Sequence, residues 1–130
     1  MLLTDFTSDE DKPPKPQLKL LFVCNSNVCR SRTFANYFKK NYPQIRVDSA
    51  GTHESADNML TELRMTWADQ IFVMDLEQAM YIHEKHPHHY DKVEIIGVSD
   101  QYDPGEPKLI DLIQFWLRQR NGYIPSYSEI

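Results

Sequence analysis

The chain has 130 residues, a formal net charge of −5 and two cysteines. Its length predicts a single domain, since domains average roughly 150 residues. The acidic balance argues against nucleic acid as a partner, because affinity for a phosphate backbone comes from lysine and arginine. Two cysteines cannot make a disulfide scaffold, and no apolar run approaches the roughly 20 residues of a membrane-spanning helix. We therefore expect a cytoplasmic protein, a monomer or weak dimer, that binds neither nucleic acid nor membrane.

The N-terminal segment differs in character from the rest of the chain. Residues 8–16 are charged and proline-rich, and they offer little apolar surface to offset the entropy lost on ordering. The sequence predicts a flexible tail over residues 1–17, with a docking arm for a partner as the alternative, and a single domain over residues 18–130.

From Leu18 onward, short apolar runs alternate with amphipathic stretches. Each apolar run is typical of a strand buried in a parallel sheet, and the runs cover residues 18–23, 45–49, 71–74 and 93–98. Helices are expected from Ser31, as a capping residue, to just before Pro43; weakly over residues 58–67; from residue 75 to about 85; and from Pro107. This alternation predicts an α/β fold with a parallel sheet covered by helices on both faces.

In such sheets, ligands bind beyond the carboxyl ends of the strands. The loop after the first strand reads Cys24-Asn25-Ser26-Asn27-Val28-Cys29-Arg30-Ser31. A loop that leads into a helix start points several backbone N–H groups at one spot and forms an anion site. A thiol there ionises easily beside an arginine, Arg30 can grip two phosphate oxygens, and Ser31 can donate a hydrogen bond to the sulfur. The pattern predicts nucleophilic attack on a phosphate monoester.

This loop, with residues 20–23 before it, resembles the phosphate-binding loop of the low-molecular-weight protein tyrosine phosphatases. The resemblance continues at residues 48–52 and 68–75, spans about residues 18–120, and is closest to short bacterial members without an insert after Ser49-Ala50-Gly51. It implies a four-stranded parallel sheet of strand order 2-1-3-4. It also implies a phosphatase that acts on phosphotyrosine in proteins, or on a small phosphomonoester, through a cysteinyl-phosphate, with no metal or organic cofactor.

The resemblance assigns a role to each part of the loop. Cys24 would be the nucleophile and Arg30 would bind the phosphoryl oxygens, while Ser31 would stabilise the thiolate. Cys29 would form a reversible protective disulfide with Cys24, and Asn27 would hold the shape of the loop in a left-handed backbone. Asn25 and Ser26 replace the family's usual Leu-Gly and change the lining of the loop, and Arg32 replaces a common proline and adds positive charge at its rim. These departures bear on substrate preference more than on the chemistry. The expected phosphate-binding residues are Asn25, Ser26, Asn27, Val28, Cys29, Ser31 and Tyr102.

A phosphatase of this type also needs a proton donor for the leaving group. The resemblance implies an aspartate in the loop after the fourth strand, where the chain offers Asp100 and Asp103. We favour Asp100, because its distance from the strand matches the family, and Tyr102 would then flank the substrate ring. Asp103-Pro104-Gly105 is expected to be an ordinary turn.

Other functions remain open. Cys24 and Cys29 could bind zinc with His83, His86, His88 and His89, although their spacing is atypical and we expect these histidines to form a solvated helix end. An arsenate reductase of the same fold would need a third cysteine, which the chain lacks. Phosphatases of the RNA-polymerase tail have a similar loop in longer chains, which leaves phosphoserine open as a substrate. A module that binds phosphoproteins without hydrolysing them is the alternative from another class.

Overall fold

The computed structural model describes residues 17–26, 29–99 and 101–120 of the chain. Strands and helices alternate along it as the apolar pattern predicts. The elements are β1 (Lys19–Cys24), α2 (Arg30–Asn41), β2 (Arg46–Gly51), α3 (Glu62–Trp67), β3 (Gln70–Val73), α4 (Leu76–Lys85), a 3-10 helix η1 (Pro87–Lys92), β4 (Val93–Ile95) and α5 (Pro107–Gln119). None of the helices in these described ranges is long and apolar enough to cross a membrane.

The four strands form one parallel sheet in the order β2-β1-β3-β4, which confirms the predicted topology. β1 and β3 lie in the centre and are almost fully buried, as their continuous apolar sequences require. Cys24 is the last residue of β1 and pairs with Gly51 at the end of β2. The carboxyl ends of the two strands therefore meet at one edge of the sheet.

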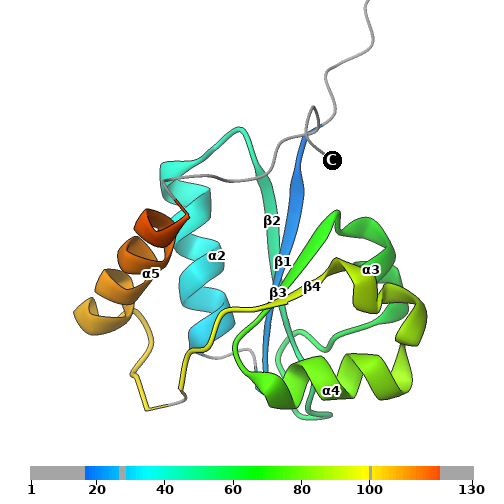
Figure 1. The fold of residues 1–130 in the computed structure, drawn as a ribbon. Coiled ribbons are helices and arrows are strands. Elements are labelled where there is room, and N and C mark those ends of the chain that lie inside the picture. The colour runs from blue at the N-terminus through cyan, green and yellow to red at the C-terminus, as the bar shows by residue number, and fades with distance from the viewer. Residues whose placement is uncertain (1–16, 27–28, 100, 121–130) are drawn as a thin grey trace, which may run out of the picture.

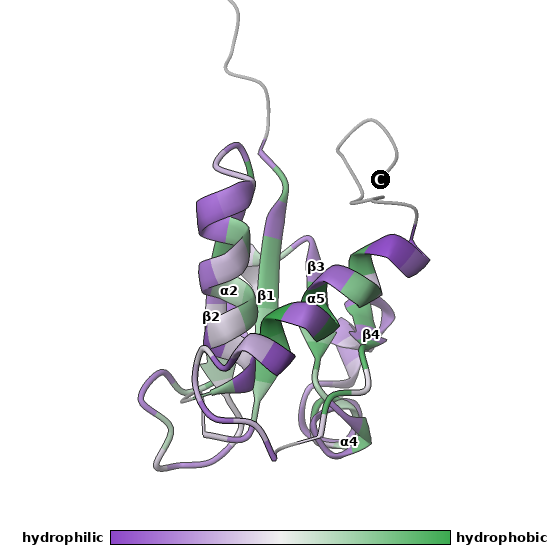
Figure 2. Cartoon of the chain, turned by 90° about the vertical axis from the view of Figure 1, so that its left-hand side faces the viewer, coloured by the Kyte–Doolittle hydropathy of each residue, from purple (hydrophilic) through white to green (hydrophobic). Residues whose placement is uncertain are grey.

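Helices cover both faces of the sheet (Figure 1), with α2 and α5 on one face and α3 and α4 on the other. Side chains of β1 alternate between these layers: Phe22 and Cys24 pack with α2 and α5, whereas Leu21 and Val23 pack on the α3 and α4 side. Figure 2 shows β1 as hydrophobic after its first residue, while α2 and α5 carry hydrophilic residues on their outer surfaces. Burial of each large apolar side chain stabilises the fold by about 1.5–3 kcal/mol.

The structure corrects two details of the predicted elements. β4 ends at Ile95 rather than at Val98, because the chain turns at Gly97, whose φ of +89° is strained for any residue with a Cβ atom. Helix α2 begins at Arg30, and Cys29 occupies the capping position. Ser31 therefore lies inside the first turn of the helix and is not its capping residue.

Candidate functional site

Cys24 lies where β1 passes into the loop before α2, and its side chain is buried. Its thiol sulfur is 3.1 Å from the hydroxyl oxygen of Ser31, and the same hydroxyl is 3.4 Å from the carbonyl oxygen of Ala50. The side chain of Ser31 is turned to Cys24 because the helix starts one residue before it. The hydroxyl is thus placed to stabilise a sulfur anion.

The Arg30 side chain is buried, and an ion pair holds its guanidinium group. Its Nη1 atom donates to Asp75 Oδ2 and to the carbonyl oxygen of Val98, each at 2.8 Å. The second contact depends on Gly97, whose backbone conformation turns the chain out of β4 directly before Val98. Arg30 is therefore fixed by the ends of β3 and β4, two strands that follow it by more than 40 residues.

Asp75 and Gln78 are functional candidates that the motif analysis did not single out. Asp75 caps α4 through its Oδ1 atom, which accepts from the backbone N–H of Glu77, while its other oxygen holds Arg30. The buried Gln78 side chain accepts from the backbone N–H of Asp75 and donates to Asn25 Oδ1, with N···O distances of 2.7 Å in both cases. The start of α4 thus holds Asn25, at the beginning of the loop, and Arg30, at its end, by side-chain hydrogen bonds.

The second cysteine contacts the loop that follows β4. Cys29 Sγ donates to the carbonyl oxygen of Tyr102 at 2.9 Å. Burial raises the pKa of the Cys29 thiol above its ordinary value of 9.0, and the charges of Cys24, Asp103 and Glu106 act in the same direction, against Arg30. Cys29 is therefore a neutral thiol and a hydrogen-bond donor near neutral pH.

The expected turn at Asp103-Pro104-Gly105 is present. The backbone N–H of Glu106 donates to the Asp103 carbonyl oxygen at 3.1 Å, and Gly105 has a φ of +70°, as a type II turn requires. The Tyr102 side chain is partly buried against the hydrophobic core. Three of the predicted site residues lie outside the described residues: Asn27, Val28 and Asp100.

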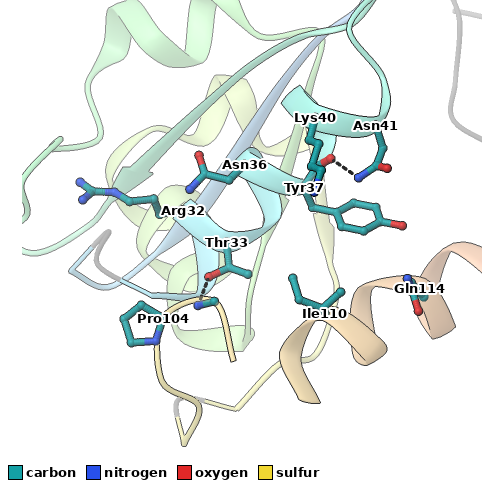
Figure 3. Close-up of a pocket in the computed structure, with 10 residues that line it drawn as sticks. Arg32, Thr33, Asn36, Tyr37, Lys40, Asn41, Pro104, Ile110 and Gln114 are labelled. Carbon is teal, nitrogen blue, oxygen red and sulfur yellow. Dashed lines mark hydrogen bonds between the residues drawn. The ribbon is translucent and has the colours of Figure 1, made fainter. Parts of the chain in front are cut away.

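A pocket of about 640 Å³ lies beside this turn, between α2 and α5 (Figure 3). Arg32 and Lys40 give the pocket positive charge, although Arg32 also pairs with the exposed Asp57 at 3.2 Å. Cys24 and Arg30 do not line this pocket. It is lined by Arg32, Thr33, Asn36, Tyr37, Lys40, Asn41, Pro104, Gly105, Ile110 and Gln114.

Three of the four histidines expected at a solvated helix end, His86, His88 and His89, instead gather around the carboxylate of Glu62, while His83 is exposed as expected. His88 is exposed as expected, but His89 is buried, which corrects the prediction for that residue. Hydrogen bonds from His89, His88 and His86 lower the pKa of Glu62 to about 2. The two cysteines lie at the other end of the strands, so the structure does not bring these histidines to the thiols.

Comparison with known proteins shows which proteins this chain is similar to. No protein-family model matches the chain. The chain is 28% identical over 119 aligned positions, covering 74% of this chain and 82% of the relative, to a probable low-molecular-weight protein-tyrosine-phosphatase, EpsP, of Ralstonia nicotianae. The chain is thus similar to a low-molecular-weight protein tyrosine phosphatase.

Solved structures of that family share the fold. The tyrosine phosphatase Wzb of Escherichia coli K30, in complex with phosphate, superposes with a TM-score of 0.71 at 16% identity, covering 85% of this chain and all of that one. An arginine phosphatase, YwlE of Geobacillus stearothermophilus, superposes with a TM-score of 0.61 at 23% identity, covering 81% and 94% of the two chains. At these identities the superpositions establish the fold alone, and the chemistry depends on this chain's own residues.

Proposed function

We propose that the protein is a cysteine-dependent phosphatase that hydrolyses phosphate monoesters, with phosphotyrosine in proteins as its substrate. The observation that carries the proposal is the contact between Cys24, at the carboxyl end of β1, and Ser31, in the first turn of α2. Arg30, at the start of the same helix, is buried and held by an ion pair with Asp75. The relatives named as tyrosine phosphatases support the same conclusion.

In the proposed reaction, the Cys24 thiolate attacks phosphorus and the bond from phosphorus to the phenolic oxygen breaks. The backbone N–H groups of the loop, among them those of Asn25, Ser26, Asn27, Val28 and Cys29, bind the phosphoryl oxygens. Nη1 of Arg30 makes the two contacts with protein atoms, so we assign its Nε and Nη2 donors to the phosphoryl group.

The leaving phenolate needs a proton, which we assign to Asp100, with Asp103 as the alternative. The carboxylate formed then accepts a proton from water, which attacks the cysteinyl-phosphate and releases phosphate and the Cys24 thiolate. Ser31 stabilises that thiolate as nucleophile and as leaving group. We place Tyr102 beside the substrate ring.

Hydrolysis of p-nitrophenyl phosphate tests the proposal. The wild-type protein in reductant is expected to turn the substrate over with inhibition by vanadate, and Cys24→Ser is expected to reduce turnover to background. Cys29→Ser is the matched control, since it removes a thiol from the same loop and should leave turnover measurable. Phosphopeptide binding by the wild type without turnover would instead identify a binding module.

The substrate class and the acid need separate assays. Peptides carrying phosphotyrosine, phosphoserine or phosphoarginine should rank phosphotyrosine first, and a preference for phosphoarginine would align the chain with the YwlE type of activity. Asp100→Ala should lower turnover of a substrate with a poor leaving group far more than Asp103→Ala does. The opposite ranking would move the acid to Asp103.

A further inference from the structure

A second group of chemically active side chains lies near the amino ends of the strands, whereas the phosphatase loop lies at their carboxyl ends. Glu62 begins α3, and three histidines follow the end of α4, in or next to η1, which leads directly into the first residue of β4. Because the strands are parallel, this position is at their amino ends, whereas Cys24 lies at a carboxyl end. Nothing in the proposed phosphatase reaction uses these side chains.

The three histidines converge on one carboxylate across more than 20 residues of sequence. His88 Nε2 and His89 Nε2 lie 2.5 and 2.7 Å from the same oxygen, Glu62 Oε2. His86 Nδ1 lies 3.0 Å from the other oxygen, Oε1. The two adjacent rings, those of His88 and His89, are side by side with centroids 4.2 Å apart. Two imidazole nitrogens and a carboxylate oxygen are thereby directed to one point.

From this geometry we propose that His88, His89 and Glu62 bind a divalent transition-metal ion, with zinc as the fitting example. Their ligand atoms lie within 4.8 Å of one another. Bonds to zinc are about 2.0–2.2 Å for imidazole nitrogen and carboxylate oxygen, so a small shift of the carboxylate admits the ion. Imidazole and carboxylate ligands suit zinc and its neighbours better than calcium or magnesium, which prefer oxygen alone.

The residues around the three ligands resemble the surroundings of known metal centres, with a supporting hydrogen bond, one buried ligand and one side open to water. His86 would not ligate the ion but would hold the carboxylate through Oε1, a supporting hydrogen bond that orients a ligand. The side chain of His89 is 8% exposed and fixes one ligand in the core, while that of His88 is 63% exposed and leaves a side open to solvent. Water can therefore supply the fourth position of a tetrahedral ion.

Such an ion would join the start of α3 to η1, the segments that precede β3 and β4. Binding to the folded state alone stabilises it in proportion to the logarithm of the metal concentration. The expected role is structural, and it is independent of whether the protein is a phosphatase.

Zinc binding by the reduced full-length chain tests the proposal, measured by competition with a chromophoric chelator and by thermal unfolding. We expect one zinc ion per chain, and zinc at 100 times its Kd should raise Tm by about 10 °C, while magnesium should not. His88→Ala and Glu62→Gln should each weaken zinc binding at least 10-fold. His83→Ala is the matched control, an exposed histidine of α4 outside the cluster, and should bind zinc as the wild type does.

Thiols also bind zinc, so the double variant Cys24→Ser/Cys29→Ser distinguishes zinc bound by the histidines from zinc bound by the thiols. It should retain the zinc ion if the histidines hold it. The proposal is overturned if the wild type binds no zinc, if the double variant loses the ion, or if His88→Ala binds zinc as tightly as His83→Ala. Since His88 is exposed, its replacement leaves the core unchanged and the comparison is made between folded proteins.

Discussion

The thiol of Cys29 donates a hydrogen bond to the backbone carbonyl oxygen of Tyr102, with a distance of 2.9 Å. This contact joins the phosphate loop to the loop that follows β4, where the proposed acid lies, across 73 residues of sequence. The proposed disulfide between Cys29 and Cys24 would use the same sulfur. Oxidation would therefore block the nucleophile and release the Tyr102 carbonyl at once.

Replacing Cys29 in the reduced protein tests the contribution of the hydrogen bond alone, without the disulfide. Cys29→Ala removes the donor, and since one such bond contributes about 1 kcal/mol, we expect kcat to fall about 5-fold with a substrate that needs the acid. Cys29→Ser keeps a donor and should retain kcat within about 2-fold. Steady-state kinetics on the reduced proteins measures both values. Equal losses in the two variants would show that the hydrogen bond does not position the acid loop.

The raised pKa of Cys29 predicts a loss of stability at alkaline pH. Because burial raises the pKa of this thiol in the folded state, the unfolded chain releases the proton first as the pH rises. The stabilising contribution is fully present below the unfolded value of about 9 and is lost as the pH rises through the folded value. Denaturant unfolding from pH 7 to 10.5 should show a steeper decline for the wild type than for Cys29→Ser. Parallel curves would contradict the prediction.

Asp75 is expected to act as a positioning residue for Arg30. Asp75→Asn keeps the helix cap but loses the ion pair, so we expect kcat to fall at least 10-fold while KM does not rise, because Arg30 still binds phosphate but in the wrong orientation. Asp75→Ala loses the cap as well and should cost a further ~1 kcal/mol of stability. Steady-state kinetics and thermal unfolding on both variants measure these effects. A higher KM with unchanged kcat would mean that Asp75 serves binding alone.

Much of the fold could be predicted from the sequence because its apolar runs are unambiguous. The continuous apolar run around Phe22 is typical of a buried strand, and the helical spacing of Leu109 and Ile113 is typical of an amphipathic helix. Both are buried in the structure as expected. The Cys24 loop could be placed because its residue types fall between a strand and a helix. Local patterns such as these decide local structure.

The remaining features depend on contacts between distant segments. Ser31 has the character of a helix cap, yet the helix starts one residue earlier and the hydroxyl is turned to Cys24. Asp75 and Gln78 form a capping box that the sequence suggests, but their contacts with Arg30 and Asn25 come from packing α4 beside the loop. His89 is buried and hydrogen-bonds Glu62, a residue 27 positions away that its local sequence does not indicate.

Gly97 provides the last prediction, since it connects backbone conformation to the site. Its φ of +89° places Val98, with its carbonyl oxygen on Arg30, directly after the turn. No atom lies within 4 Å of the position a Cβ atom would take, so the cost of Gly97→Ala is conformational, about 1–2 kcal/mol. Gly105→Ala is the matched control, because its φ of +70° imposes a similar cost with equally open space around it.

Both variants should therefore lose similar stability in denaturant unfolding. Gly97→Ala should in addition lower kcat/KM about 10-fold, because a shifted Val98 carbonyl leaves the buried guanidinium of Arg30 with one acceptor fewer. Gly105 lies within the Asp103–Glu106 turn and donates its backbone N–H to Thr33 rather than contacting Arg30, so its variant should lose much less activity. Equal activity losses in the two variants would mean that the Val98 carbonyl does not position Arg30 and that the ion pair with Asp75 does so alone.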